Sequence, residues 1–135
     1  MVITYFKDAV RINHAKQNTQ PLGLPVEFNN ERAVLTEILR QWAVPGRWTH
    51  GNAAVDRNGV LVAPKSKVAC AFCAVGAVTR FSKNVALARK IKLELGLVAA
   101  RLFKERTLVG VNDTLGFDSI RTVVASRLAT IAKQQ

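Results

Sequence analysis

The sequence is poor in cysteine, histidine and acidic residues, and it has no long apolar run. Two cysteines among 135 residues are too few for the disulfide framework of a small secreted domain. No stretch approaches the roughly 18 uninterrupted apolar residues of a membrane span. The N-terminal residues also lack the apolar segment of a signal peptide. We therefore expect a cytoplasmic protein without membrane contacts.

Length and composition predict one folded domain. Single domains typically contain about 100 to 200 residues, and an apolar fraction of 49% is that of a globular protein rather than a disordered one. Residues 14–25 are polar and then contain Pro21, Gly23 and Pro25, which disfavour regular structure. We expect an N-terminal arm or linker over residues 1–29 and a single helical domain over residues 30–135. The oligomeric state is left open.

Two helices are predicted in the first two thirds of the chain. The apolar stripe from residue 31 to about Trp42 indicates an amphipathic helix with Asn29 or Asn30 as its N-cap. The Ala-rich segment 67–80, with Ser66 before it, is apolar on all sides. That pattern is typical of a buried helix. Gly76 inside it lowers the helix propensity, so we expect a neighbour to approach it closely.

The last third of the chain predicts two or three more helices. Residues 82–95 form an amphipathic pattern that begins at Ser82 and ends at Gly96. Residues 97–104 predict a short helix, and a final one follows a loop over residues 110–116, with Asp118 or Ser119 as its cap. A turn at Gly96 between two of these helices would allow a weak helix-turn-helix interpretation.

A β-hairpin is predicted around residues 53–62. Two short apolar runs flank the turn Asp56-Arg57-Asn58-Gly59, and an Asn-Gly pair between such runs is a hairpin signal. A lone hairpin is marginally stable, so it must pack on the helices or pair with the N-terminal segment. The expected fold class is mainly α (α+β): a compact bundle of four to five helices with one small hairpin.

The stretch from about residue 31 to residue 133 resembles a family of small uncharacterised proteins of bacteriophages and actinobacteria. The pattern consists of Trp48-x-x-Gly51, Ala54-x-Asp56-x-x-Gly59, Cys73-Ala-x-Gly-Ala77 and Asn112-Asp113 in that order. The resemblance implies a compact domain of a phage accessory protein, working in the host cytoplasm. It implies no catalytic residue. The basic character and the first 29 residues depart from the pattern.

The two cysteines, Cys70 and Cys73, permit two interpretations. A redox pair requires a depressed thiolate pKa, usually at an exposed helix N-terminus. A zinc site requires four ligands, and only His14 and His50 could complete one, without metal-like spacing. Both cysteines lie in an apolar run, where a free cysteine packs as a small hydrophobe. We favour core packing and expect neither a metal nor another cofactor.

A pocket is conceivable where Trp48, His50 and Asp56 approach Asn112 and Asp113. If the two segments converge, His50 with Asp56 or Asp113 would supply a base and the group that orients it. The structural alternative assigns Trp48 to the core, Asp56 to the hairpin turn and Asn112-Asp113 to the start of the last helix. Residues 110–116 lack the Lys-Ser/Thr ending of a phosphate-binding P-loop. An enzyme is therefore the least favoured hypothesis.

The positive charge is concentrated in the C-terminal half. The chain has 20 basic and nine acidic residues; residues 63–135 contain thirteen of the former and four of the latter. Such a balance favours association with polyanions. The candidate binding residues are Arg80, Lys83, Arg89, Lys90, Lys92, Arg101, Lys104, Arg106, Arg121 and Arg127. The structural alternative is a solvated face of an amphipathic helix.

Three functional hypotheses follow. The first is a non-enzymatic protein that binds nucleic acid through its phosphates without reading sequence. The second is an inhibitor that uses the same cationic face to bind an acidic or nucleic-acid-binding surface of a host protein. The third is a small enzyme that uses His50.

Overall fold

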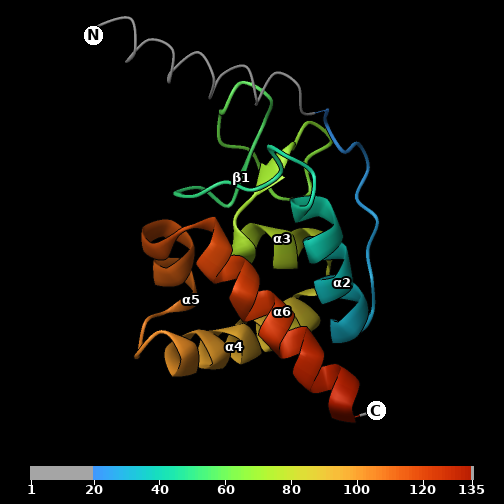
Figure 1. Cartoon of the computed structure of the whole chain (residues 1–135). Helices are drawn as coiled ribbons and strands as arrows, with labels where there is room; N and C mark the ends of the chain where they lie inside the picture. The colour runs from blue at the N-terminus through green and yellow to red at the C-terminus, as the bar shows by residue number, and fades with distance from the viewer. Residues whose placement is uncertain (1–19, 135) are drawn as a thin grey trace, which may run out of the picture.

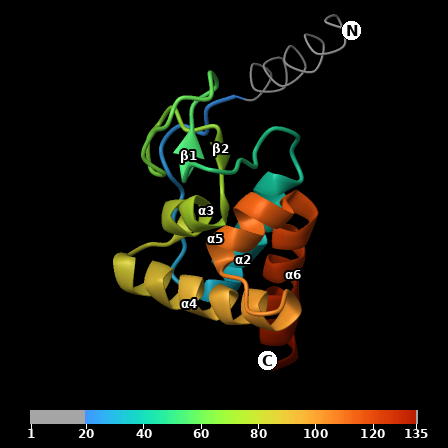
Figure 2. The same ribbon diagram turned by 90° about the vertical axis from the view of Figure 1, so that its left-hand side faces the viewer.

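The computed structural model describes residues 20–134. Predictions for residues 1–19, which include His14 and most of the arm, lie outside this range. The fold is mainly helical with one small antiparallel sheet, as predicted, but the second strand of that sheet is Ala71–Phe72 rather than residues 60–62. Figures 1 and 2 show the helices gathered at one end of the molecule and the strands, with their long connections, at the other.

We call the two ends the helical region and the loop region. The helical region contains α2 (Glu31–Trp42), α3 (Ala74–Phe81), α4 (Val85–Leu102), α5 (Leu108–Gly110), the π-helical turn η1 (Val111–Leu115) and α6 (Phe117–Gln134). The loop region comprises residues 20–24 and 43–73, with β1 (Ala54–Val55) and β2 (Ala71–Phe72). The strands pair Ala54 with Phe72 and Val55 with Ala71.

The core of the helical region is built from apolar faces of four helices. α2 begins where the Asn30 side chain accepts a hydrogen bond from Ala33 N at 2.8 Å, as predicted. The fully buried core side chains include Val34, Leu35, Ile38, Val78, Ile91, Leu95, Ile120, Val123 and Val124. Full burial of one such side chain contributes about 1.5–3 kcal/mol, so these helices hold one another in place.

The prediction of a helix over residues 67–80 is wrong for its first half. α3 begins only at Ala74, and the Cys73 thiol accepts from Gly76 N as its N-cap. The backbone before it is extended because neighbouring loops use its polar groups: Cys70 N donates to Val55 O at 2.8 Å, and Phe72 N donates to Arg47 O at 2.9 Å. A short apolar run cannot by itself distinguish a buried strand from a buried helix.

The prediction that a helix ends at Gly96 is also wrong. α4 continues through Gly96 to Leu102, and its N-cap is Asn84 rather than Ser82. Leu95, Val98 and Ala99 are buried around the glycine, and tertiary packing of this kind outweighs a low helix propensity. There is accordingly no turn at this position, and the helix-turn-helix interpretation is wrong.

Three further segments differ from or match the predictions: the hairpin turn, residues 110–116 and the described part of the N-terminal arm. Asp56 shapes the hairpin turn by accepting from Asn58 N and Val60 N, both at 2.9 Å, and Val55 forms an antiparallel bridge with Leu61. The predicted loop 110–116 instead contains the end of α5 and η1. In the described part of the predicted arm, Leu22 N donates to Ala69 O, and Phe28 pairs with Ser82 beside α3.

Candidate nucleic-acid interface

The outward side of α4 carries exposed basic residues. Arg89 and Arg101 stand three helical turns apart, with Leu93 and Leu97 between them at four-residue spacing. Residues four apart share one side of a helix, and all four are exposed, as is Lys90 beside them. Ile91, Leu95 and Val98 occupy the opposite, buried side. α4 therefore presents cations and apolar side chains to solvent along one side.

The turn after α4 extends this basic side. Lys104, Glu105 and Arg106 are exposed. Lys104 and Glu105 adopt positive φ angles of 55° and 71°, a conformation that costs a non-glycine residue about 1–2 kcal/mol. A hydrogen bond from Glu105 N to Ala100 O at 2.8 Å holds this turn against α4. Lys83, before the helix, is also exposed.

We name this set of exposed cations the α4 surface. It consists of Lys83, Arg89, Lys90, Arg101, Lys104 and Arg106. The described residues include no salt bridge to any of them. Arg121, the predicted site residue near the beginning of α6, is likewise exposed.

Arg80 does not belong to this surface. Its side chain is only 1% exposed and lies over the Phe72 ring, with 5.5 Å between the guanidinium carbon and the ring centroid. Nη1 donates to Ser66 O at 2.7 Å and to Pro64 O at 3.2 Å, and Nη2 donates to Gly23 O at 2.8 Å. Because the guanidinium holds loop carbonyls, the prediction that Arg80 meets a partner is wrong.

Arg127 is neutralised within the protein. Its guanidinium donates to both carboxylate oxygens of Glu31, at 2.8 and 3.0 Å, and lies 3.5 Å from Glu94. The hydrogen bond to Glu31 raises the pKa of Arg127, and the charges of Glu31 and Glu94 act in the same direction. This residue joins α6 to α2 and α4, so it is a structural contact rather than a free cation.

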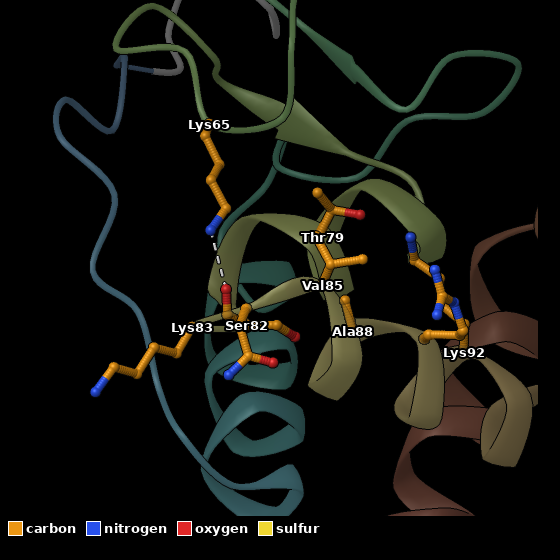
Figure 3. Close-up of a pocket in the computed structure, with 9 residues that line it drawn as sticks. Lys65, Thr79, Ser82, Lys83, Val85, Ala88 and Lys92 are labelled. Atoms are coloured by element: carbon orange, nitrogen blue, oxygen red, sulfur yellow. Dashed lines mark hydrogen bonds between the residues drawn. The ribbon is translucent and has the colours of Figure 1, made fainter.

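Lys92, the remaining predicted site residue, faces a pocket beside α4. The pocket has a volume of about 570 Å³ and lies between α3 and the first two turns of α4 (Figure 3). Its lining residues are Lys65, Thr79, Ser82, Lys83, Asn84, Val85, Ala88, Arg89 and Lys92. Burial lowers the pKa of Lys92, the nearby Cys73 thiol opposes that shift, and the positive charge of Arg89 adds to it.

The two motif segments do converge, and Asn112 is the residue that joins them. Its side chain is 1% exposed. Oδ1 accepts from Trp48 Nε1 and from Ala74 N, both at 3.0 Å, while Nδ2 donates to Thr49 O at 3.2 Å. Every polar atom of the amide has a protein partner. The geometry is that of a structural bracket between η1, α3 and the loop region.

The carboxylates proposed to work with His50 have other partners. Asp113 Oδ1 accepts from Gly51 N at 3.0 Å and from Asn112 Nδ2 at 2.8 Å, and Asp56 holds the hairpin turn. His50 is exposed and its ring lies 5.7 Å from the Trp48 ring. Asn112 and Asp113 line a cavity of about 180 Å³ with Gly51 and Cys73, but His50 does not line it. The described residues contain no hydrogen bond between His50 and either carboxylate.

The cysteines pack in the core, as favoured from the sequence. Both are buried and free. Burial raises the pKa of the Cys70 thiol and of the Cys73 thiol, which disfavours the thiolate at neutral pH. Among residues 20–134 no group of three or more metal-binding side chains comes together.

Sequence reasoning missed several residues that matter here. Arg47 is buried and donates to the carbonyls of Gln20 and Cys70, although nothing in its surroundings in the sequence distinguishes it from an exposed arginine. Lys65, Thr79 and Ser82 line the pocket beside α4. The Ser82-Lys83-Asn84 run before an apolar helix pattern was a signal for a helix start, but not for a pocket.

The chain was compared with protein-family models, curated proteins and solved structures, and none matches it. No helix within residues 20–134 combines the length and the hydropathy of a membrane-spanning segment.

Proposed function

We propose that the protein is a non-enzymatic binding protein, consistent with a phage accessory role, that engages nucleic acid through its phosphate backbone. The α4 surface supports this proposal. Three exposed cations stand on α4, one precedes it and two follow it, and few acidic residues lie near them in the sequence. Of the two glutamates in this part of the chain, Glu94 lies 3.5 Å from Arg127, and Glu105 lies in the turn between Lys104 and Arg106.

The chemistry of the α4 surface suits phosphates rather than base edges. Arg and Lys side chains neutralise backbone phosphates and release counterions, and such contacts do not depend on base sequence. The outward side of α4 contains no Asn or Gln, the residues that most often read adenine. Binding should therefore be strong at low salt and tolerant of sequence.

The test is an anisotropy titration of a labelled DNA duplex at several salt concentrations. The triple variant Lys90→Gln, Arg101→Gln and Arg106→Gln should bind more weakly, and the slope of log affinity against log salt should become shallower by about 0.9 for each phosphate that is no longer neutralised. The matched control replaces Arg40, Lys67 and Lys133 by Gln, which removes the same charge from other exposed positions.

Two outcomes would contradict this proposal. Wild-type affinity that is absent at low salt, or does not change with salt, excludes phosphate binding as the main interaction. Equal losses in the two triple variants would assign the effect to total charge rather than to the α4 surface.

A second candidate function is inhibition of a host protein through an acidic or nucleic-acid-binding surface. The observation that favours it is apolar: Leu93 is 63% exposed and Leu97 60% exposed, in line with the cations of α4. Exposed apolar side chains within a charged surface are typical of protein interfaces. Capture from nuclease-treated lysate that is lost in Leu93→Ser/Leu97→Ser, with DNA binding retained, would favour this function over the first.

A further inference from the structure

The pocket beside α4 has two positive groups available to a ligand. Lys65 donates to the Glu27 carboxylate and, at 2.9 Å, to Ser82 O. Figure 3 shows the Lys83 side chain pointing away from the other lining residues. Arg89 and Lys92, one turn apart on α4, line the pocket and have no carboxylate partner among residues 20–134. Two like charges so placed favour an anion between them.

Two hydroxyl groups of the pocket are also without partners. Ser82 is 1% exposed, and its Oγ makes no hydrogen bond within the described chain. Buried polar groups nearly always have a partner, so each exception calls for an explanation. The Thr79 hydroxyl, also in the lining, has none among these residues either. In Figure 3, Thr79 and Ala88 stand between Ser82 and Lys92. A ligand seated there would meet donors from both sides.

The beginning of α4 adds a partial positive charge. Asn84 Oδ1 accepts from Leu87 N at 2.9 Å, which leaves the N–H groups of Val85 and Ala86 without an acceptor inside the helix. Asn84 and Val85 belong to the pocket lining. The first turn of an 18-residue helix favours negative charge nearby.

We propose that this pocket, the α4 pocket, binds the phosphate group of an organic phosphate monoester. Arg89 and Lys92 supply charge, and Ser82 and Thr79 supply hydrogen-bond donors. A phosphate monoester has three terminal oxygens for these donors, one more than a carboxylate. Val85 and Ala88 give the pocket an apolar wall against which the organic part can lie. None of the described residues that line the pocket is acidic.

The same chemistry has two sources, a free nucleotide and the 5′-phosphorylated end of a strand. The second source rests on the proposed function, because it requires nucleic acid on the adjoining α4 surface. The first does not. Both present a doubly charged phosphate and an organic group, which is what distinguishes them from a backbone phosphodiester with its single charge.

The first experiment follows backbone amide signals by NMR at constant ionic strength. Inorganic phosphate and a nucleoside 5′-monophosphate should shift the signals of Thr79, Val85 and Ala88 in a saturable way, and acetate should not. Lys92→Gln and Ser82→Ala should each lower the affinity for the monophosphate by about tenfold, as expected for a lost charge-assisted hydrogen bond. Lys133→Gln, an equal charge change on an exposed part of α6, is the matched control.

Three results would overturn the assignment. They are shifts that do not saturate, acetate that competes equally with phosphate, and an affinity that neither variant lowers while the spectrum shows both folded. Should Ser82→Ala disturb the fold, Thr79→Val replaces it, since valine keeps the shape of threonine and removes only the hydroxyl.

The second experiment identifies the source of the phosphate. A short oligonucleotide is titrated with a 5′-phosphate and with a 5′-hydroxyl. Tighter binding of the phosphorylated strand, lost in Lys92→Gln, supports the pocket with a strand end in it. If the two strands bind equally and the monophosphate still binds, the pocket takes a free nucleotide rather than a strand end. Binding of the monophosphate without binding of either strand keeps the pocket and contradicts the proposed function.

Discussion

The loop region and the helical region hold their backbones in place by different means. In the helical region, most backbone groups pair within their own helices, and apolar side chains pack the helices together. The loop region instead depends on side chains that donate to its backbone carbonyls: Arg80 of α3 donates to those of Gly23, Pro64 and Ser66. The loops need such donors because a buried carbonyl without a partner is costly.

This difference decides what a polar residue is available for. Arginines near the loop region are consumed by the fold, as Arg47 and Arg80 are. The helices satisfy their own backbone, so Arg89 and Arg101 on α4 are free to face solvent. The same residue type is thus structural where it meets loop carbonyls or, like Arg127, a carboxylate, and it is available for binding where it faces solvent on α4.

The largest expected effect comes from the contact between the two regions. A Cβ at Gly76 of α3 would lie 1.7 Å from Ala53 O of the loop region, so Gly76→Ala should force the two apart and lower the free energy of unfolding by at least about 3 kcal/mol. The matched control is Gly96→Ala in α4, where a Cβ meets nothing within 4 Å. That change should stabilise by about 0.5–1 kcal/mol. Urea unfolding measures both, and a stable Gly76→Ala would contradict the close contact.

The second prediction compares an asparagine that joins the two regions with one that only caps a helix. Asn112→Ala removes the partner of Trp48 Nε1, Ala74 N and Thr49 O and should cost about 3 kcal/mol, because three buried or partly buried groups lose their hydrogen bonds at once. Asn30→Ala removes only the N-cap bond of α2 and should cost about 1 kcal/mol. Similar losses for both, measured by thermal or urea unfolding, would show that the bracket at Asn112 contributes no more than an ordinary cap.

The helical region could be predicted from the sequence because its stability is mostly local and periodic. α2 followed from one apolar stripe and the cap at Asn30, and the close approach at Gly76 followed from a glycine in an otherwise helical pattern. The buried run before Ala74 was assigned to the wrong element. Its conformation depends on backbone partners as distant as Leu22 and Val55, which no local pattern reveals.

The candidate site was only partly predictable for the same reason. Exposure of Arg89, Lys90 and Arg101 follows from the helical period once α4 is recognised. The roles of Arg80 and Arg127 depend on which carbonyl or carboxylate the fold places beside them, Ser66 O at 2.7 Å and Glu31 at 2.8 Å. The pocket required the angle between α3 and α4, which the sequence does not encode in any short segment.

The third prediction separates a structural arginine from a binding one with the same substitution. Arg80→Met should lower the free energy of unfolding by about 2–3 kcal/mol, because three partly buried carbonyls lose their donor, and should leave DNA affinity per folded molecule unchanged. Arg101→Met should do the opposite: stability within about 0.5 kcal/mol of the wild type and weaker binding at low salt. Unfolding curves and anisotropy titrations give both readouts. Weaker binding by folded Arg80→Met would return Arg80 to the binding set.

The smallest effect concerns Arg127, the one arginine of the predicted site that the helical region itself neutralises. Glu31→Gln removes the carboxylate that accepts two hydrogen bonds from Arg127. Because this pair is partly buried, the free energy of unfolding should fall by about 1 kcal/mol. The control Glu37→Gln, whose partner Arg40 is exposed, should lower it by less than about 0.5 kcal/mol. Glu94, which lies 3.5 Å from Arg127, is unchanged in this variant and still neutralises the arginine. DNA affinity should therefore change by less than about twofold, a difference of roughly 0.4 kcal/mol. A tenfold gain in DNA affinity would show that Arg127, without Glu31, joins the α4 surface. Whether an arginine is paired within the fold or free to bind DNA would then depend on a single carboxylate rather than on its place in the fold.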